Sequence, residues 1–240
     1  MLRIEHLTKT YHGEKTAVSD LNIHVSPGDI YGFIGHNGAG KTTTIKSVVG
    51  IHEFDKGEIY VDGISIKDAP IECKKRFAYI PDNPDLYEFL TGIQYLNFIA
   101  DIFGVPADIR KKEIEKEAQE LGIYEVLGDL VSSYSHGMKQ KLAIIGAFLH
   151  KPKLLILDEP FVGLDPEATL KLKDKMKELC KQGSAVFFST HVLDVAEKLC
   201  TKVAIISEGK LVLEGVTEEL VREKSLEQIF MEVAVHGKAN

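Results

Sequence analysis

The amino-acid sequence predicts an α/β fold in which a block of helices is inserted into a mostly parallel sheet. Three observations support this class. Strand-like apolar runs alternate with amphipathic segments after Pro152, which is the pattern of parallel strands joined by helices. The run IYGFIG at 30–35 is too uniformly apolar to alternate, and therefore predicts a strand covered on both faces. Residues of about 82–150 instead show helical spacing and little strand signal.

The segment before residue 82 is predicted to be mainly strands. Apolar and polar residues alternate in LRIEHL and again between Val18 and Val25, and Ser26–Asp29 is typical of a turn. We expect these first strands to form an N-terminal antiparallel β-subdomain beside the parallel sheet. The predicted elements are strands at 2–7, 18–25, 30–35, 57–63 and 77–81 and a helix at 41–50.

The middle of the chain predicts an inserted α-helical subdomain. Apolar residues recur at helical spacing from Ile93 to Ala100, and RKKEIEKEAQELG predicts a mixed-charge surface helix that Gly122 ends. Strands are expected again at 153–160, 184–190, 203–207 and 210–215, with helices at 166–182 and from 192. The helix at 166–182 is well marked, because Asp165 can cap it, Pro166 suits its first position and Gly183 can end it.

We expect one domain over 1–240 with three parts. The α/β core comprises 1–81 and 151–222, the helical subdomain spans about 82–150, and a C-terminal tail spans about 223–240. This length is sufficient for one sizeable hydrophobic core.

Composition narrows the classes of function. The chain has 29 Lys and Arg against 36 Asp and Glu, a formal charge of −7, which argues against a nucleic-acid partner. Its three cysteines lie far apart, as expected in a reducing compartment. No signal-peptide pattern and no apolar run near the roughly 18 residues of a membrane span is found. We therefore expect a cytoplasmic chain that would need a spanning partner to act at a membrane.

GHNGAGKTT at 35–43 satisfies the phosphate-binding pattern G-x-x-x-x-G-K-[ST] between a predicted strand and helix, and so predicts a P-loop NTPase core. Glycines let successive N–H groups face phosphate oxygens, and the helix N-terminus favours an anion. Lys41 would reach the β- and γ-phosphates and Thr42 would bind Mg²⁺. The predicted nucleotide-binding residues of this loop are Gly35, His36, Asn37, Gly38, Ala39, Gly40, Lys41, Thr42 and Thr43.

LLILDEP at 154–160 predicts a buried strand that delivers two carboxylates to the edge of the sheet where ligands bind. Asp158 is placed to hold Mg²⁺ through water, and Glu159 to polarise an attacking water. The alternative is a solvated acidic strand end. A further pattern, SSYSHGMKQKL at 132–142, predicts a helix capped by Ser135 and kept open by Gly137, which is either a second anion site or ordinary capping.

The chain resembles the ATP-binding cassette (ABC) family of ATPases over Tyr11 to about Gly215. The resemblance rests on the order of the three patterns above, followed by Gly163–Pro166 and Ser189-Thr190-His191. YSHGMKQKL, STHVLDVAEKLC and SLEQIFMEV are similar to the nucleotide-binding subunits of bacterial ABC-2-type export systems. The resemblance implies a subunit that binds and hydrolyses ATP and thereby drives translocation.

Further residue roles are implied by this resemblance alone. Tyr11 would stack on adenine, with Val18 beneath the sugar side, and His191 would contact the γ-phosphate and hold the attacking water, beside Lys41 and Glu159. A plain surface aromatic and a satisfied strand-end histidine are the alternatives for Tyr11 and His191. Two chains would sandwich two ATP molecules. The signature helix at 134–138, with Ser135 and Gly137, would meet the γ-phosphate of the second chain, and Asp165 would lie across that interface.

The chain departs from the family pattern at three places. The predicted metal ligands are Thr42, Asp158 and Asp82. Many family members have Gln at the position of Asp82, so direct contact between Asp82 and the metal is in question. Tyr134, His136 and Met138 replace Leu, Gly and Gln of the signature, and His36 replaces a commoner Pro.

The implied partners are a second ABC ATPase subunit, identical or related, and an integral membrane permease, at the cytoplasmic face of the cell membrane. Leu86, Tyr87, Phe89 and Leu90 either dock that permease or seat the helical block on the core. A soluble ABC ATPase acting on ribosomes or DNA is the alternative function. A small-molecule kinase would share the loop but would not explain Ser135–Gly137 or the turn at 163–166.

Overall fold

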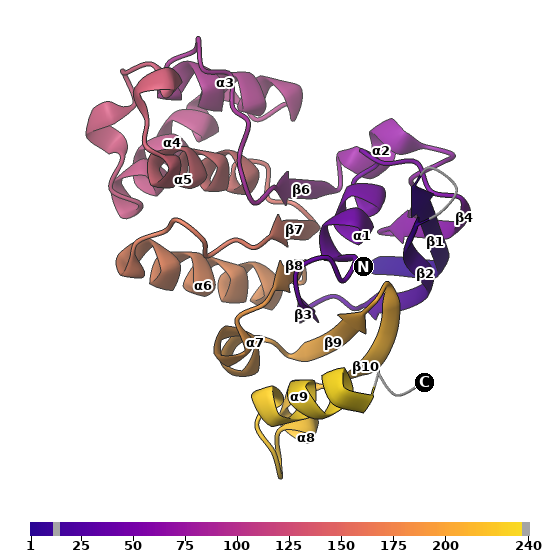
Figure 1. Ribbon diagram of the computed structural model, residues 1–240. Helices are drawn as coiled ribbons and strands as arrows, with labels where there is room; N and C mark the ends of the chain where they lie inside the picture. Colours follow the sequence, from indigo (N-terminus) through magenta and orange to yellow (C-terminus); the bar gives the residue numbers. More distant parts are fainter. Residues whose placement is uncertain (12–14, 237–240) are drawn as a thin grey trace.

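The computed structural model describes residues 1–11 and 15–236. An antiparallel sheet has the strand order β2-β1-β4-β5 and lies beside a second sheet in the order β10-β9-β3-β8-β7-β6 (Figure 1). The antiparallel sheet consists of β1 (Leu2–Tyr11), β2 (Lys15–Val25), β4 (Lys56–Val61) and β5 (Ile64–Ser65). The fold class and the antiparallel N-terminal part are thereby confirmed.

The second sheet positions the site. Its strands β9, β3, β8, β7 and β6 are parallel, and only the edge strand β10 runs antiparallel to its neighbour β9. The bounds are β3 (Ile30–Ile34), β6 (Phe77–Ile80), β7 (Leu154–Asp158), β8 (Ala185–Thr190), β9 (Lys202–Ser207) and β10 (Lys210–Val216). Because the central strands are parallel, their C-terminal ends meet at one edge, which is where ligands of such sheets bind.

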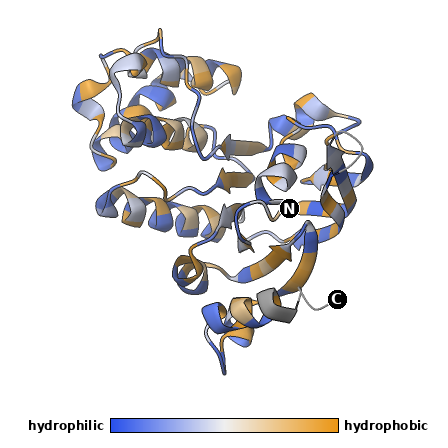
Figure 2. Cartoon of the chain, in the orientation of Figure 1, coloured by the Kyte–Doolittle hydropathy of each residue, from blue (hydrophilic) through white to orange (hydrophobic). Residues whose placement is uncertain are grey.

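Helices cover the sheet on both sides. The helices are α1 (Lys41–Val48), α2 (Pro70–Lys74), α3 (Gly92–Ile102), α4 (Ala107–Glu120), α5 (His136–Phe148), α6 (Pro166–Lys181), α7 (Leu193–Leu199), α8 (Thr217–Leu220) and α9 (Leu226–His236). Side chains of β8 illustrate the layers: Val186 and Phe188 join the core under α5, α6 and α7, and Phe187 joins the core shared with α1 and the antiparallel sheet. Figure 2 shows the hydrophobic strands between helices of mixed polarity.

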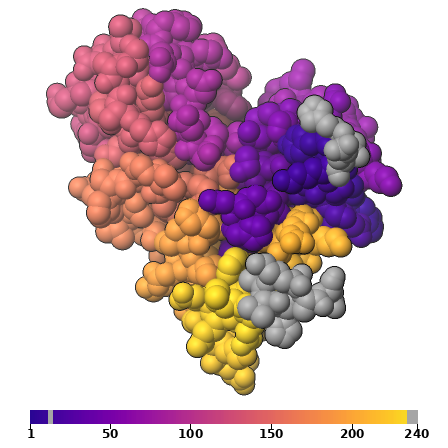
Figure 3. All heavy atoms as spheres, in the orientation of Figure 1, coloured from indigo at the N-terminus to yellow at the C-terminus, as the bar shows by residue number. Residues whose placement is uncertain are grey.

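The helices α3, α4 and α5 form a lobe of their own, which a notch separates from the N-terminal lobe on the face shown in Figure 3. Thr91 starts α3 with a capping box, in which its hydroxyl accepts from the N–H of Gln94 and the Gln94 side chain accepts from the N–H of Thr91. The lobe matches the predicted helical segment, although the proposed domain bounds stay a prediction. In the described part of the chain, no helix has both the length and the apolar character needed to cross a membrane.

Among the strands and α-helices of the described residues, β5, α2, α8 and α9 were not predicted. β5 and α2 have two and five residues, too few for a periodic signal. α8 and α9 lie at and beyond the end of the predicted core, and α9 occupies most of the predicted tail. Leu226 at its start is fully buried, so tertiary packing holds this helix on the core. The helix predicted from Asp165 is confirmed, since the Asp165 carboxylate accepts from the N–H of Ala168 at 2.8 Å.

Candidate functional site

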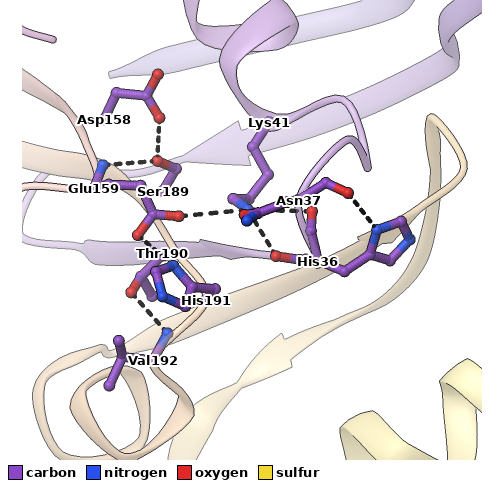
Figure 4. Close-up of polar contacts among 10 residues, drawn as sticks. His36, Asn37, Lys41, Asp158, Glu159, Ser189, Thr190, His191 and Val192 are labelled. Carbon is purple, nitrogen blue, oxygen red and sulfur yellow. Dashed lines mark hydrogen bonds and ion pairs between the residues drawn. The ribbon is translucent and has the colours of Figure 1, made fainter. Parts of the chain in front are cut away.

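The glycine-rich loop joins β3 to α1 and holds Lys41 at the helix start. Gly40 has φ +110°, and a Cβ there would lie 2.5 Å from the carbonyl oxygen of Ala17, so only glycine fits. The Lys41 side chain is 6% exposed. Its Nζ donates to the carbonyl oxygens of Gly35 at 2.7 Å and His36 at 3.3 Å (Figure 4). The loop therefore fixes one ammonium group in a cradle of backbone.

A cavity of about 740 Å³ opens beside this loop. It lies between the end of β1, the start of β2, the loop and the end of β7. Its walls are Tyr11, Lys15, Thr16, Ala17, His36, Asn37, Gly38, Gly40, Lys41, Thr42, Thr43, Asp82, Glu159, Glu208 and Gly209. This is the size range of small-molecule sites, and most of the predicted nucleotide-binding residues line it.

Glu159 follows β7, and its carboxylate lies between the ammonium group of Lys41 and the imidazole ring of His191. Its Oε1 is 3.4 Å from the Nζ of Lys41, and its Oε2 is 2.9 Å from the Nδ1 of His191 (Figure 4). Glu159 has φ +48°, a left-handed conformation that non-glycine residues rarely adopt. The structure thus brings together Lys41, Glu159 and His191, which the sequence places up to 150 positions apart.

Asp158 ends β7 and is fully buried. Burial raises the pKa of its carboxyl, and the hydroxyls of Ser189 and Thr42 act in the opposite direction by favouring the charged form. Its Oδ1 accepts a hydrogen bond from Ser189, and its Oδ2 has no hydrogen-bond partner among the described residues. A buried carboxylate oxygen in this state fits a hydrated cation, and Thr42 supplies a hydroxyl beside it.

Mg²⁺ prefers oxygen ligands and keeps several waters, so a few protein oxygens suffice when phosphates complete the shell. Within 1–11 and 15–236, no group of three or more His, Cys, Asp or Glu side chains could hold a metal ion. The Thr42 hydroxyl beside the Asp158 carboxylate fits the sparse protein contribution that Mg²⁺ on a triphosphate needs. Asp82 is exposed and lines the same cavity, so its carboxylate adds negative charge near Asp158.

Tyr11 lines the same cavity. Its hydroxyl lies 3.5 Å from the Oγ1 of Thr43, His52 contacts its ring edge-on at 5.9 Å between centroids, and the Nζ of Lys9 lies 5.3 Å from its ring centroid. These contacts fix an aromatic ring at the cavity wall. Val18 is fully buried and is not among the lining residues, so its predicted place beneath the sugar stays a prediction.

The signature helix does not reach this cavity. Ser135 caps α5 by accepting from the N–H of Met138 at 3.3 Å, and it is exposed. A Cβ at Gly137 would lie 2.8 Å from the carbonyl oxygen of Gly163, so α5 begins against the turn that precedes α6. Ser135 and Gly137 therefore lie outside the cavity beside the glycine-rich loop.

Asp165 and His36 each have local partners. Besides capping α6, Asp165 forms an ion pair with Lys141 of α5 at 2.6 Å, and its partners lower the pKa of its carboxyl. His36 is exposed, and its Nδ1 lies 2.8 Å from the carbonyl oxygen of Asn37.

The sequence predicts no role for Ser189, nor for the cavity residues Lys15, Thr16, Ala17, Glu208 and Gly209. Ser189 lies on β8 beside Asp158 and is fully buried. The available signal was a hydroxyl two positions before His191 in a strand that would neighbour β7.

Known proteins show the same organisation. A model of the ABC transporter family matches residues 18–162. The chain is 34% identical over 238 residues to the ABC-type transporter ATP-binding protein EcsA of Bacillus subtilis (strain 168), covering 97% of this chain and 96% of EcsA. It is 36% identical over 240 residues to the bacitracin transport ATP-binding protein BcrA of Bacillus licheniformis, covering 100% of this chain and 76% of BcrA.

A solved structure, described as the ATP-binding subunit of an ABC transporter, superposes with a TM-score of 0.92 at 33% identity and covers 98% of this chain and 99% of that one. The transport reading is thereby favoured over an ATPase acting on ribosomes or DNA. The family model covers more than half of the chain, and the sequence relatives are matched over at least 76% of their length. The chain therefore belongs to the ABC transporter family, as an ATP-binding and ATP-hydrolysing subunit.

Proposed function

We propose that ATP and Mg²⁺ bind in the cavity beside the glycine-rich loop and that Glu159 activates the water that attacks the terminal phosphate. The observation that carries this proposal is the pair of contacts from Glu159 to Lys41 and to His191, at the end of a cavity of nucleotide size. Phosphate release from ATP by the purified chain tests it. We expect release with Mg²⁺ and none with EDTA, and equal rates in both would contradict the proposal.

Each residue has one task in this scheme. Lys41 exchanges its contact with Glu159 for the β- and γ-phosphates, and this frees the Glu159 carboxylate to accept a proton from water. His191 keeps its contact with Glu159 and faces the terminal phosphate. Bound Mg²⁺, held through Thr42 and Asp158, would neutralise charge that develops on the phosphates.

Tyr11 is proposed to stack on the adenine ring, because it places an aromatic ring on the wall of the cavity that Glu159 also lines. The loop from Gly35 to Thr43 would surround the phosphates with backbone N–H groups. The nucleotide would thus extend across the cavity from Tyr11 to Glu159.

A second chain is proposed to complete the site. Ser135 and Gly137 lie outside the chain's own cavity, yet they present a helix N-terminus that favours anions. Docking this surface on the nucleotide of another copy, or of a related subunit, would place the signature helix on the γ-phosphate. Asp165 lies on the same surface, since it pairs with Lys141 of α5.

ATP is expected to dimerise the Glu159→Gln variant, because a ligand shared across an interface favours association by mass action and this variant keeps its ATP. Light scattering of the purified variant should give the monomer mass without nucleotide and about twice that mass with ATP and Mg²⁺. The double variant Lys41→Ala/Glu159→Gln, in which the loop cation is missing, should stay at the monomer mass. An unchanged mass with ATP would contradict closure of this chain on itself.

A membrane permease is proposed as the further partner, with the chain held at the cytoplasmic face of the membrane and with export as the direction. A hollow of about 350 Å³ lies between β6 and the helices α3 and α5, and Pro81, Pro84 and Asp85 of the loop after β6 line it. Beside it, Tyr87, Phe89 and Phe98 form an aromatic patch with ring centroids 5.9 and 5.4 Å from Tyr87.

The four apolar residues of the loop divide into two groups. Leu86 is buried and Leu90 is half-buried against the core, so these two seat the helical lobe. Tyr87 and Phe89 are 48% and 76% exposed. Adjacent exposed aromatic side chains are typical of interaction sites, and we propose that this patch receives a short helix of the permease.

Tyr87→Glu and Phe89→Glu are each expected to leave ATP hydrolysis by the isolated chain within about twofold of wild type, because neither side chain supports the core. Both should remove the chain from the membrane fraction of cells that express the permease. The matched control is Met231→Glu. Met231 is an apolar residue of α9 at the other end of the molecule, and its exposure of 59% lies between those of Tyr87 and Phe89. The Met231→Glu chain should stay in the membrane fraction. Unfolding of both patch variants, or unchanged membrane association, would contradict this docking site.

A further inference from the structure

Ser189 makes two hydrogen bonds that join the consecutive acidic residues of the site. Its Oγ donates to Oδ1 of Asp158 and accepts from the backbone N–H of Glu159 at 3.0 Å (Figure 4). The residue is fully buried, and the parallel pairing of β7 with β8 places Ser189 directly opposite Asp158. The two hydrogen bonds use the hydroxyl as both donor and acceptor.

We infer that Ser189 is a positioning residue for ATP hydrolysis, which sets the orientation of the Asp158 carboxylate toward Mg²⁺ and the direction of the Glu159 side chain. The inference rests on the proposed function, which gives Asp158 and Glu159 their tasks. Ser189 itself touches neither phosphate nor water in this scheme and acts only through its two neighbours.

Ser189 limits the orientation of the Asp158 carboxylate. A carboxylate can rotate about its Cβ–Cγ bond and expose either oxygen, and the hydrogen bond from Ser189 holds Oδ1 in place. Oδ2, the oxygen without a partner among the described residues, is therefore the one available to a hydrated cation beside Thr42. Partners of this kind orient ligands and commonly affect metal affinity about 10- to 100-fold.

Ser189 also contacts the backbone of Glu159. Its left-handed backbone turns the chain sharply after β7 and directs the carboxylate to Lys41 and His191. Such a conformation costs on the order of 1–3 kcal/mol and persists only where surrounding contacts hold it. Two hydrogen bonds hold the backbone of Glu159 at this turn: its N–H donates to Oγ of Ser189 at 3.0 Å, and its carbonyl oxygen accepts from the N–H of Val162 at 3.2 Å. The bond to Ser189 is the one that a side chain supplies.

If the Ser189 hydroxyl had a merely structural role, removing it would lower stability without a specific effect on Mg²⁺ or turnover. Ser184 provides a matched control for this possibility. Ser184 immediately precedes the same strand, is 7% exposed, and donates one hydrogen bond to the carbonyl oxygen of Pro152 at 2.9 Å. It touches neither acidic residue. Removing either hydroxyl should lower stability, and Ser189→Ala should lower it more, because that change deletes two hydrogen bonds, one of them to a carboxylate, and Ser184→Ala deletes one.

The experiment compares wild type, Ser189→Ala and Ser184→Ala as purified full-length chains. Calorimetry gives the affinity for ADP in EDTA and in Mg²⁺, thermal unfolding gives the Tm, and phosphate release gives kcat and KM for ATP. For Ser189→Ala we expect an ADP affinity in EDTA within about twofold of wild type and a gain in ADP affinity on adding Mg²⁺ that is reduced at least about fivefold. We expect kcat to fall about 10- to 100-fold with KM within about threefold.

Ser184→Ala should lower the Tm by a smaller amount and keep the wild-type Mg²⁺ gain and kcat. A Ser189→Ala variant with the wild-type Mg²⁺ gain and kcat, or a Ser184→Ala variant with the same losses, would overturn the inference. Wild-type turnover distinguishes failure of the proposed function from failure of the role of Ser189. If the wild type shows no Mg²⁺-dependent hydrolysis, the proposed function is wrong. If the wild type hydrolyses ATP and Ser189→Ala matches it, only the role of Ser189 is wrong.

Discussion

Glu159→Gln is expected to lower kcat for ATP hydrolysis about 10²- to 10⁴-fold while the affinity for nucleotide stays within about threefold of wild type. The amide has the shape of the carboxylate but is a poor base, so the water is no longer activated. Binding should persist because the change removes the anion that contacts Lys41 at 3.4 Å and leaves the ammonium free for phosphate. Steady-state phosphate release gives kcat, and calorimetry with ADP gives the affinity.

The control for this variant is Glu178→Gln, which makes the same chemical change at an exposed position on α6. It should hydrolyse ATP at the wild-type rate. Near wild-type turnover by Glu159→Gln would show that another group activates the water.

Lys41→Ala is expected to weaken ATP binding by about 100-fold or more. The ammonium is the cation that the loop buries beneath the expected phosphate position, and charge-assisted hydrogen bonds contribute about 1.5–3 kcal/mol each. The loss should be far smaller for Lys46→Ala, which removes a cation from the same helix, α1, but outside the cavity wall. Equilibrium titration with ATP in EDTA measures both variants without turnover, and equal affinities of the two would rule out the role assigned to Lys41.

Much of the fold could be predicted from local signals. β3 and β7 have uninterrupted apolar runs because both faces of these strands are covered, and all ten of their residues are buried in the structure. The helix α6 has its cap at Asp165 and its end before Gly183, so its bounds followed from capping chemistry. α9 could not be predicted in the same way, because its position depends on contacts with α7 that only the folded chain brings about.

Part of the candidate site could likewise be predicted from local signals, and part depends on how the strands are arranged. The motif from Gly35 to Thr43 places its residues through local backbone geometry, so the loop could be predicted as a unit. The contact between Lys41 and Glu159 and the bridge through Ser189 depend on which strands are neighbours and in which register. Sequence patterns do not specify that register, and the hydroxyl at 189 therefore had no predicted role. The partner residues of Ser135 and Gly137 lie, in the proposed assembly, on another chain.

The most direct test of the account is the identity of the nucleotide that each variant retains. Wild type, Glu159→Gln and Lys41→Ala are incubated with labelled ATP and Mg²⁺, freed of unbound nucleotide and quenched, and the bound ATP and ADP are separated. We expect ADP on the wild type, intact ATP on Glu159→Gln and neither nucleotide on Lys41→Ala. Labelled ADP on Glu159→Gln, or ATP retained by Lys41→Ala, would contradict the claim that Lys41 holds the triphosphate for cleavage by water that Glu159 activates.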